Sequence, residues 1–152
     1  MNEQTTEIAP VTKAVTINRP LEEAFRIFTE GIATWWPLET QSIYGSAATT
    51  VVLEGRVSGR LYEVSKEGEE GVWGTVTVWE PPHRVVCEWR LPPGSPVATD
   101  LEVRFLPQGE GTRVELEHRG WERHGASAAE LRGLYEPGWD HVLGRYVTAV
   151  AG

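Results

Sequence analysis

His118 is the polar residue best placed to do chemistry. It follows Val114 and Leu116 at alternate positions, so it falls on the apolar side of a predicted strand, near the strand's end. An imidazole with a reference pKa near 6.5 can act as a general base or hydrogen-bond a ligand. The alternative, which we prefer, is a core histidine whose ring is satisfied by a backbone carbonyl.

Arg60 and Glu63 are a second candidate pair, on a short predicted strand over residues 59–64. If both side chains pointed inward, they would bind the polar head of a ligand through charge-assisted hydrogen bonds. If they pointed outward, they would be an ordinary solvated pair. We favour the solvated interpretation, because unpaired charge is costly to bury.

Motifs for metals and cofactors are lacking in the sequence. His118 and His124 are six residues apart, which is not a zinc spacing, and Cys87 is the single cysteine. There is no Gly-x-Ser-x-Gly elbow and no phosphate loop. The glycines of residues 109–111 form a predicted hairpin turn with no helix after it, so they are not a dinucleotide fingerprint. We therefore expect no metal and no cofactor.

The composition narrows the classes of partner. The 152 residues include 22 acidic and 14 basic ones, a formal net charge of −8. This balance disfavours nucleic acids and anionic membrane surfaces, both of which select for lysine and arginine. No apolar run approaches the ~18 residues of a membrane span, and residues 1–10 lack the plan of a signal peptide. The expected location is the cytoplasm, and membrane insertion is not expected.

The chain length favours one domain, with residues 1–10 as a flexible leader and 11–152 as the folded part. The apolar spacing predicts a strand over 11–17, a helix from residue 20 to about 28, and a short helix that ends at Pro37. Turn-rich links then separate six predicted strands, which cover residues 50–54, 59–64, 72–80, 84–91, 100–106 and 112–118. Residues 92–96 are one of the predicted loops.

Apolar residues at helical spacing in the last part of the chain predict a long helix that reaches residue 150. Residues 127–130, Ser-Ala-Ala-Glu, fit a capping box at its start. Pro137 cannot donate to the carbonyl of Gly133, so we expect a kink or a restart between residues 133 and 137.

Alternation in the last three long strands predicts an inner, apolar face and an outer, charged face. The inner residues are Val85, Cys87, Trp89, Leu101, Val103, Phe105, Val114, Leu116 and His118. Residues 72–80 carry apolar groups on both sides, so their inner face is unassigned. The long helix would cover the inner face, where large aromatic side chains either fill the space or outline a pocket.

This order of elements resembles the SRPBCC superfamily, which shares the helix-grip fold of START domains and the birch-pollen allergen. Within it, the chain resembles bacterial homologues of the activator of the ATPase of heat-shock protein ninety. The motifs that carry the resemblance are Asn18-Arg19-Pro20, Gly59-Arg60, Gly74-Thr75-Val76 running to Pro81-Pro82, residues 85–89, Gly111-Thr112-Arg113-Val114, His118, Gly120-Trp121 and residues 138–143.

The resemblance implies an α+β helix-grip fold, in which a curved antiparallel sheet wraps around the long C-terminal helix. The order along the chain would be one strand, two short helices, a six-strand meander and the helix. Relatives hold lipids, sterols, polyketides or similar molecules in a cavity between sheet and helix. The expected ligand-binding residues are Phe28, Trp35, Trp36, Tyr62, Trp89, Phe105, His118, Trp139, Leu143 and Tyr146.

Three functions stay open on the sequence. The first is binding of a small hydrophobic molecule. The second is a cyclase or dehydratase in which His118, with Arg60 or Tyr62, acts as acid, base or oxyanion donor. The third is a module that contacts a chaperone and stimulates its ATPase. Whether the chain forms a homodimer is also left open.

Overall fold

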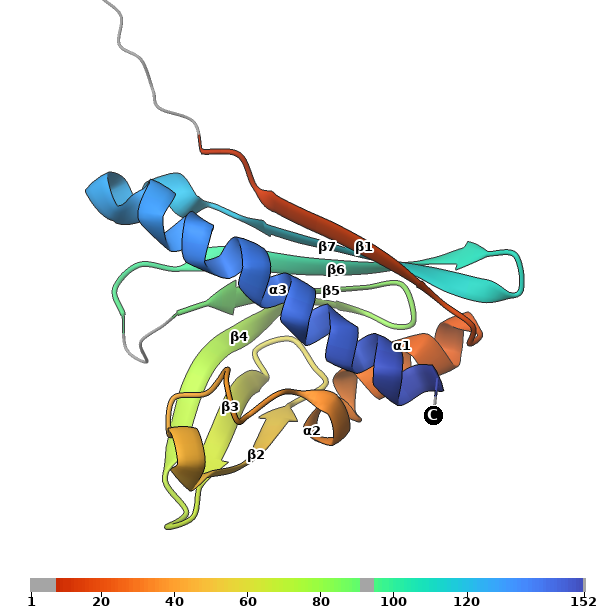
Figure 1. The fold of residues 1–152 in the computed structure, drawn as a ribbon, viewed down its shortest axis with the longest axis horizontal. Helices are drawn as coiled ribbons and strands as arrows, with labels where there is room; N and C mark the ends of the chain where they lie inside the picture. The colour runs from red at the N-terminus through yellow and green to blue at the C-terminus, as the bar shows by residue number, and fades with distance from the viewer. Residues whose placement is uncertain (1–7, 91–94, 152) are drawn as a thin grey trace, which may run out of the picture.

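The computed structural model describes residues 8–90 and 95–151. The first seven residues of the predicted leader and most of the predicted 92–96 loop lie outside that range. The described chain forms one curved antiparallel sheet crossed by a long helix (Figure 1). This confirms the predicted helix-grip architecture.

The sheet has seven strands in the order β1-β7-β6-β5-β4-β3-β2. Six of them follow one another as a meander, and β1 pairs antiparallel with β7, so the first strand lies beside the last. The strands are β1 (Val11–Ile17), β2 (Ala48–Leu53), β3 (Arg60–Ser65), β4 (Glu70–Glu80), β5 (Arg84–Trp89), β6 (Thr99–Gln108) and β7 (Gly111–Arg119).

Two short helices, α1 (Leu21–Thr29) and α2 (Ile32–Trp35), connect β1 to the rest of the sheet. A 3-10 turn, η1 (Gly45–Ala47), precedes β2. The apolar stripe of α1 faces the core, where Ala24, Phe25 and Phe28 are buried.

The long helix α3 (Ala128–Ala151) runs diagonally across the concave face of the sheet (Figure 1). It continues through Pro137 as one element, so the predicted restart does not occur. The predicted capping residue Ser127 belongs instead to a preceding 3-10 turn, η2 (Trp121–Ser127), which was not predicted. Its hydroxyl donates to the carbonyl of His124 at 3.3 Å. None of the described helices is both long enough and apolar enough to cross a membrane.

Lys13 explains why a charged residue interrupts the apolar face of β1. Its ammonium group reaches α3, where it pairs with Glu136 at 2.8 Å and with Asp140 at 3.0 Å. These carboxylates raise the pKa of Lys13, chiefly through the hydrogen bond to Glu136. The inward-facing lysine therefore ties β1 to α3 without an unpaired charge.

The two faces of β5, β6 and β7 are as predicted, with the named inner residues buried. The outer face is a network of arginine and glutamate side chains centred on Glu102, which is itself buried. Its carboxylate accepts from Arg84 and from Arg119, each at 2.7 Å. Burial raises the pKa of Glu102, but these hydrogen bonds outweigh it and the pKa is lowered. The charged outer face leaves the concave side as the apolar one.

Strand β4 carries two irregularities, which is why its inner face could not be assigned from alternation. Its pairing with β3 shifts so that Trp73 is an extra residue, and its pairing with β5 shifts so that Thr77 is another. A bulge resets which residues point inward. Trp73 and Val76 consequently are both buried, although they are three positions apart.

Candidate functional site

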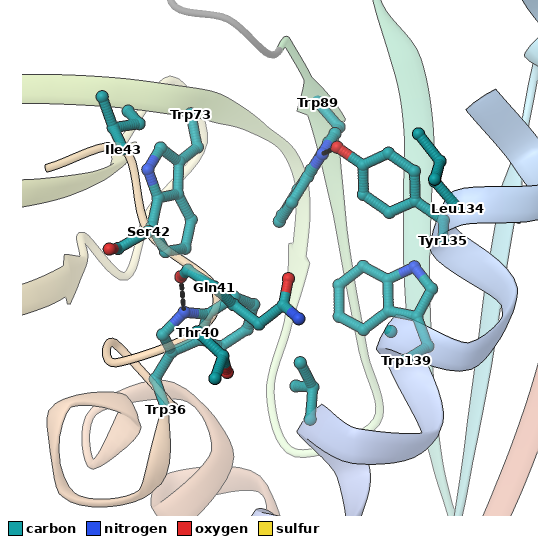
Figure 2. A pocket seen from close by; sticks show the side chains of 12 residues that line it. Trp36, Thr40, Gln41, Ser42, Ile43, Trp73, Trp89, Leu134, Tyr135 and Trp139 are labelled. Atoms are coloured by element: carbon teal, nitrogen blue, oxygen red, sulfur yellow. Dashed lines mark hydrogen bonds between the residues drawn. The ribbon is translucent and has the colours of Figure 1, made fainter. Parts of the chain in front are cut away.

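A pocket of about 440 Å³ lies between α3, Trp73 of β4, the last residue of β5 and the segment that follows α2 (Figure 2). Its volume falls within the range of about 300–1,000 Å³ that is usual for small-molecule sites. The residues around it are Trp36, Thr40, Gln41, Ser42, Ile43, Trp73, Trp89, Leu134, Tyr135, Gly138, Trp139 and Val142.

Four tryptophans form the walls, and we call Trp36, Trp73, Trp89 and Trp139 the aromatic box. Each ring contacts the next in a closed cycle. The centroid distances are 5.0 Å for Trp36–Trp73, 5.8 Å for Trp73–Trp89, 5.4 Å for Trp89–Trp139 and 6.1 Å for Trp139–Trp36. These distances are typical of interacting aromatic pairs, so the rings hold one another in place.

The indole N–H groups of the aromatic box all donate to acceptors of the protein itself. For Trp36, Trp73, Trp89 and Trp139 in turn, the acceptors are the carbonyl of Gln41 at 2.7 Å, the carboxylate of Glu63 at 2.8 Å, the hydroxyl of Tyr135 at 3.0 Å and Nδ1 of His118 at 3.0 Å. The box therefore offers a guest the carbon surface of its rings and no indole donor.

Thr40, Gln41, Ser42 and Tyr135 add polar groups to these walls, and Tyr135 and Gln41 are the two with the longest side chains. The hydroxyl of Tyr135 accepts from Trp89, so its own proton remains to donate toward the pocket. Burial raises the pKa of Tyr135, with a smaller opposing effect from the Trp89 hydrogen bond, so the phenol is neutral at physiological pH. The side chain of Gln41 extends into the space beside Trp139 (Figure 2). Its amide nitrogen lies near Gly138 of α3.

Glu63 lies behind the pocket wall, and the prediction that it is solvated was wrong. Its side chain is fully buried and points to the concave side. The carboxylate accepts from the backbone N–H of Ile43 at 2.7 Å and of Tyr44 at 2.9 Å, besides the Trp73 indole. Alternation with buried Leu61 was the signal that could have identified it, but the donors come from a segment without periodicity.

The predicted partner of Glu63, Arg60, lies on the outer side of the sheet. Its guanidinium group pairs with Glu54 and Glu70 and lies 4.2 Å from the centroid of the Tyr62 ring. Arg60 and Tyr62 therefore do not meet His118, and the three residues of the catalytic hypothesis are not brought together.

His118 is fully buried, with both ring nitrogens bonded inside the core. Because an indole N–H can only donate, Nδ1 accepts from Trp139, and the ring proton lies on Nε2. Nε2 then donates to Thr99 Oγ1 at 2.7 Å, and the Thr99 hydroxyl donates to the carbonyl of Trp89 at 3.4 Å. Burial, with a smaller effect of His124, lowers the pKa of His118 to about 3. The geometry is that of a neutral core histidine that orients Trp139.

The structure separates the ten predicted ligand-binding residues. Trp36, Trp89 and Trp139 line the pocket. His118 lies behind its wall and Tyr62 on the outer face. The other five belong to the core around α1, which we call the packed end; they are the aromatic residues Phe28, Trp35, Phe105 and Tyr146, which contact one another, and Leu143.

Some pocket residues were not predicted from the sequence, among them Gln41, Trp73, Tyr135 and Val142. Tyr135 and Val142 share the apolar stripe of α3 with Trp139, so the helical period contained a signal for them. Trp73 was hidden by the bulge, and no pattern marked residues 40–43.

Metal and thiol chemistry find no support in the site. Within residues 8–90 and 95–151, no three histidine, cysteine, aspartate or glutamate side chains are grouped as metal ligands. Cys87 is buried in the core, and this burial raises the pKa of its thiol to about 12.

Solved structures with this architecture include a synthase and a resistance protein. The anthrahydroquino-gamma-pyrone synthase Txn09, solved as a complex, is 35% identical, with 93% of this chain and 97% of that chain covered and a TM-score of 0.65. The self-sacrificing resistance protein CalC from Micromonospora echinospora is 29% identical, with 93% and 94% covered and a TM-score of 0.70.

An Aha1 dimer from Colwellia psychrerythraea shares the fold, with a TM-score of 0.65, coverage of 94% and 96%, and 16% identity. No curated protein matches the sequence. Residues 18–151 match the family described as Activator of Hsp90 ATPase homolog 1-like protein. This match spans nearly the whole sheet and all of α3, and the helix-grip fold agrees with it. The chain therefore belongs to the Activator of Hsp90 ATPase homolog 1-like family, within the SRPBCC superfamily.

Proposed function

We propose that this protein binds a small, flat, hydrophobic molecule in the aromatic box. The observation that carries the proposal is that four tryptophans line an open pocket of about 440 Å³ while all their N–H groups bond elsewhere. A wall of ring faces without free donors favours a planar apolar guest through stacking and burial.

One edge of the guest would be polar. The Tyr135 hydroxyl has a proton to donate next to Trp89, and the Gln41 amide can donate or accept next to Trp139 (Figure 2). A carbonyl or phenolic oxygen on the guest would bond to one of these two groups. The 35% identity to a synthase that is named for an anthrahydroquinone-type product supports a fused-ring ligand.

Gly138 provides the cleanest test, because its backbone lines the pocket. A Cβ at this position would have one neighbour within 4 Å, the Gln41 amide nitrogen at 4.0 Å. Gly138→Phe would therefore project a ring into the pocket with little strain on the helix. Trp139→Ala is less clean, since it would also remove the hydrogen bond to His118.

The experiment titrates wild-type protein with alizarin, a three-ring dihydroxyanthraquinone, and follows quenching of tryptophan fluorescence. We expect one binding site, and at least a tenfold weaker affinity for Gly138→Phe. Gly144→Phe is the matched control, because Gly144 is an exposed glycine of the same helix and an added Cβ there would meet no atom within 4 Å. Equal affinity of both variants and the wild type would contradict the proposal.

A second candidate is an enzyme that closes or dehydrates a ring in the same pocket. The similarity to the synthase favours it. Of the described groups, Tyr135 is the acid that faces the pocket, whereas His118 is enclosed in the core. Turnover of a polyketide-type substrate that Tyr135→Phe abolishes, and that His118→Gln retains, would support this function.

A third candidate follows from the family description, which names an activator of a chaperone ATPase. It requires a contact surface outside the pocket. The test measures ATP hydrolysis by purified Hsp90 with saturating amounts of this protein, first the wild type and then Gly138→Phe. Stimulation that Gly138→Phe retains would support a chaperone contact, and unchanged hydrolysis would reject it.

A further inference from the structure

We propose that Glu63 is a positioning residue that fastens the segment of residues 41–44 over the aromatic box and thereby sets how long a guest stays bound. The inference rests on the proposed ligand-binding function. We call residues 41–44 the cover of the pocket. The proposal is that the buried carboxylate of Glu63 controls this cover without touching the guest.

The first observation is the environment of the carboxylate. Glu63 is 0% exposed, and within the described residues no lysine, arginine or histidine forms an ion pair with it. A buried carboxylate without a counter-ion is costly unless hydrogen bonds satisfy it. Here three neutral N–H groups do so, two from the consecutive residues Ile43 and Tyr44 and one from Trp73.

The second observation is how the segment is held. Within residues 8–90 and 95–151, the hydrogen bonds that join residues 41–44 to the sheet are the two to Glu63. The remaining bonds of the segment are local, such as Gln41 N–H to the Pro37 carbonyl at 2.8 Å. The connection between the cover and the sheet is therefore concentrated on one side chain.

The third observation is the close contact between the segment and β4. Gly71 pairs with Glu63 across the sheet, and a Cβ on Gly71 would lie 2.8 Å from Ile43 Cδ1 and 3.2 Å from Tyr44 Oη. Ile43 in turn lines the pocket. The segment thus lies directly on β4. Its position relative to the aromatic box depends on Gly71, which it contacts, and on Glu63, which accepts its hydrogen bonds.

Glu63→Gln tests the fastening with almost no change in volume. The amide keeps one oxygen acceptor but replaces the other with an NH₂ group, so a donor would face one of the two backbone N–H groups. That mismatch removes one bond of the cover and leaves a buried N–H unsatisfied. We expect alizarin to dissociate at least tenfold faster, measured by stopped-flow fluorescence at a temperature where the variant is fully folded.

Hydrogen exchange gives a readout that does not depend on a ligand. We expect the amides of Ile43 and Tyr44 to be protected in the wild type and to exchange at least tenfold faster in Glu63→Gln. Glu54→Gln is the matched control, because the Glu54 carboxylate also accepts a backbone N–H, that of Arg60 at 2.8 Å, but outside the pocket. Its dissociation rate should stay within about twofold of the wild type.

Gly71→Ala provides a second route if Glu63→Gln does not fold. It leaves the carboxylate intact and pushes against Ile43 from below, so faster dissociation is again expected. Wild-type binding with unchanged dissociation in the folded variants would overturn the fastening role and leave the binding function in place. Unprotected Ile43 and Tyr44 amides in the wild type would overturn it as well. Failure of the wild type to bind alizarin would overturn both.

Discussion

The packed end and the aromatic box both lie between one curved sheet and one helix, yet a pocket opens beside the box, whereas side chains fill the space at the packed end. Both are built from large aromatic residues on inner positions. At the packed end, Phe28 contacts Trp35, Phe105 and Tyr146, with ring centroids 5.0–5.6 Å apart. At the box, the four indoles also contact one another, but an open pocket of about 440 Å³ lies against them, between α3 and the segment after α2.

The difference lies in the element that comes between sheet and helix. Helix α1 inserts its apolar stripe at the packed end, and the Tyr146 hydroxyl donates to the carbonyl of Ala24 at 2.8 Å. At the box, the chain after α2 lies over the opening as an irregular segment and contributes Gln41 and Ile43. Aromatic residue types therefore do not decide between a core and a site; a third layer of secondary structure does.

The largest effect that separates the two ends is expected from Phe28→Ala. Truncation of a buried phenylalanine costs about 3–5 kcal/mol of unfolding free energy, because transfer energy is lost and a cavity remains. The affinity of the folded protein for alizarin should stay within about twofold of the wild type. Urea unfolding and fluorescence titration measure the two quantities. If Phe28→Ala weakens binding as much as Gly138→Phe does, the two ends are one continuous site.

Much of the fold was predictable because the strands obey simple rules. Leu101, Val103 and Phe105 alternate with the charged residues at 100, 102 and 104, and a one-sided antiparallel sheet follows from that pattern. The rules failed where the backbone departs from regular pairing. The extra residues Trp73 and Thr77 reset the alternation of β4. Gly74, next to Trp73, is a residue that often marks a bulge, but the neighbours of Thr77 are valines, which carry no such signal.

The second prediction concerns pH and the core behind the box. The pKa of His118 is lowered to about 3 in the folded state, against about 6.5 when unfolded, so the unfolded state binds the extra proton first. The contribution of neutral His118 to the free energy of unfolding is therefore complete above about pH 6.5 and is lost as the pH falls toward 3. Between pH 7.5 and 4.5, His118 should account for a loss of about 3 kcal/mol.

His118→Phe isolates this contribution. Other groups also titrate in the same range, so the informative quantity is the difference between the two proteins in urea unfolding at each pH. The variant is expected to be less stable at pH 7.5, because the Trp139 N–H loses its acceptor, but to lose about 3 kcal/mol less on acidification. The same slope in both proteins would mean that water reaches His118 and that the wall of the box is not closed behind Trp139.

The candidate site was less predictable than the fold, for a reason that Glu63 illustrates. Its position beside Leu61 on the inner face was readable, but a buried carboxylate is credible only when its donors are known. Those donors are backbone N–H groups of Ile43 and Tyr44, twenty and nineteen positions away in the chain. Backbone groups carry no sequence signature, so the satisfied carboxylate looked like a solvated one.

The smallest expected effect comes from Tyr135→Phe, and it separates the polar edge of the box from its walls. The variant removes the hydroxyl that accepts from Trp89, and water in the open pocket can replace it, so stability should fall by about 1 kcal/mol or less. Alizarin, which carries carbonyl oxygens, should bind about three- to tenfold more weakly, because it loses a neutral hydrogen bond. Anthracene has the same ring number and no acceptor, so its affinity should not change. If both molecules lose affinity equally, Tyr135 acts by orienting Trp89 rather than by donating to the guest, and recognition in the box rests on ring faces alone.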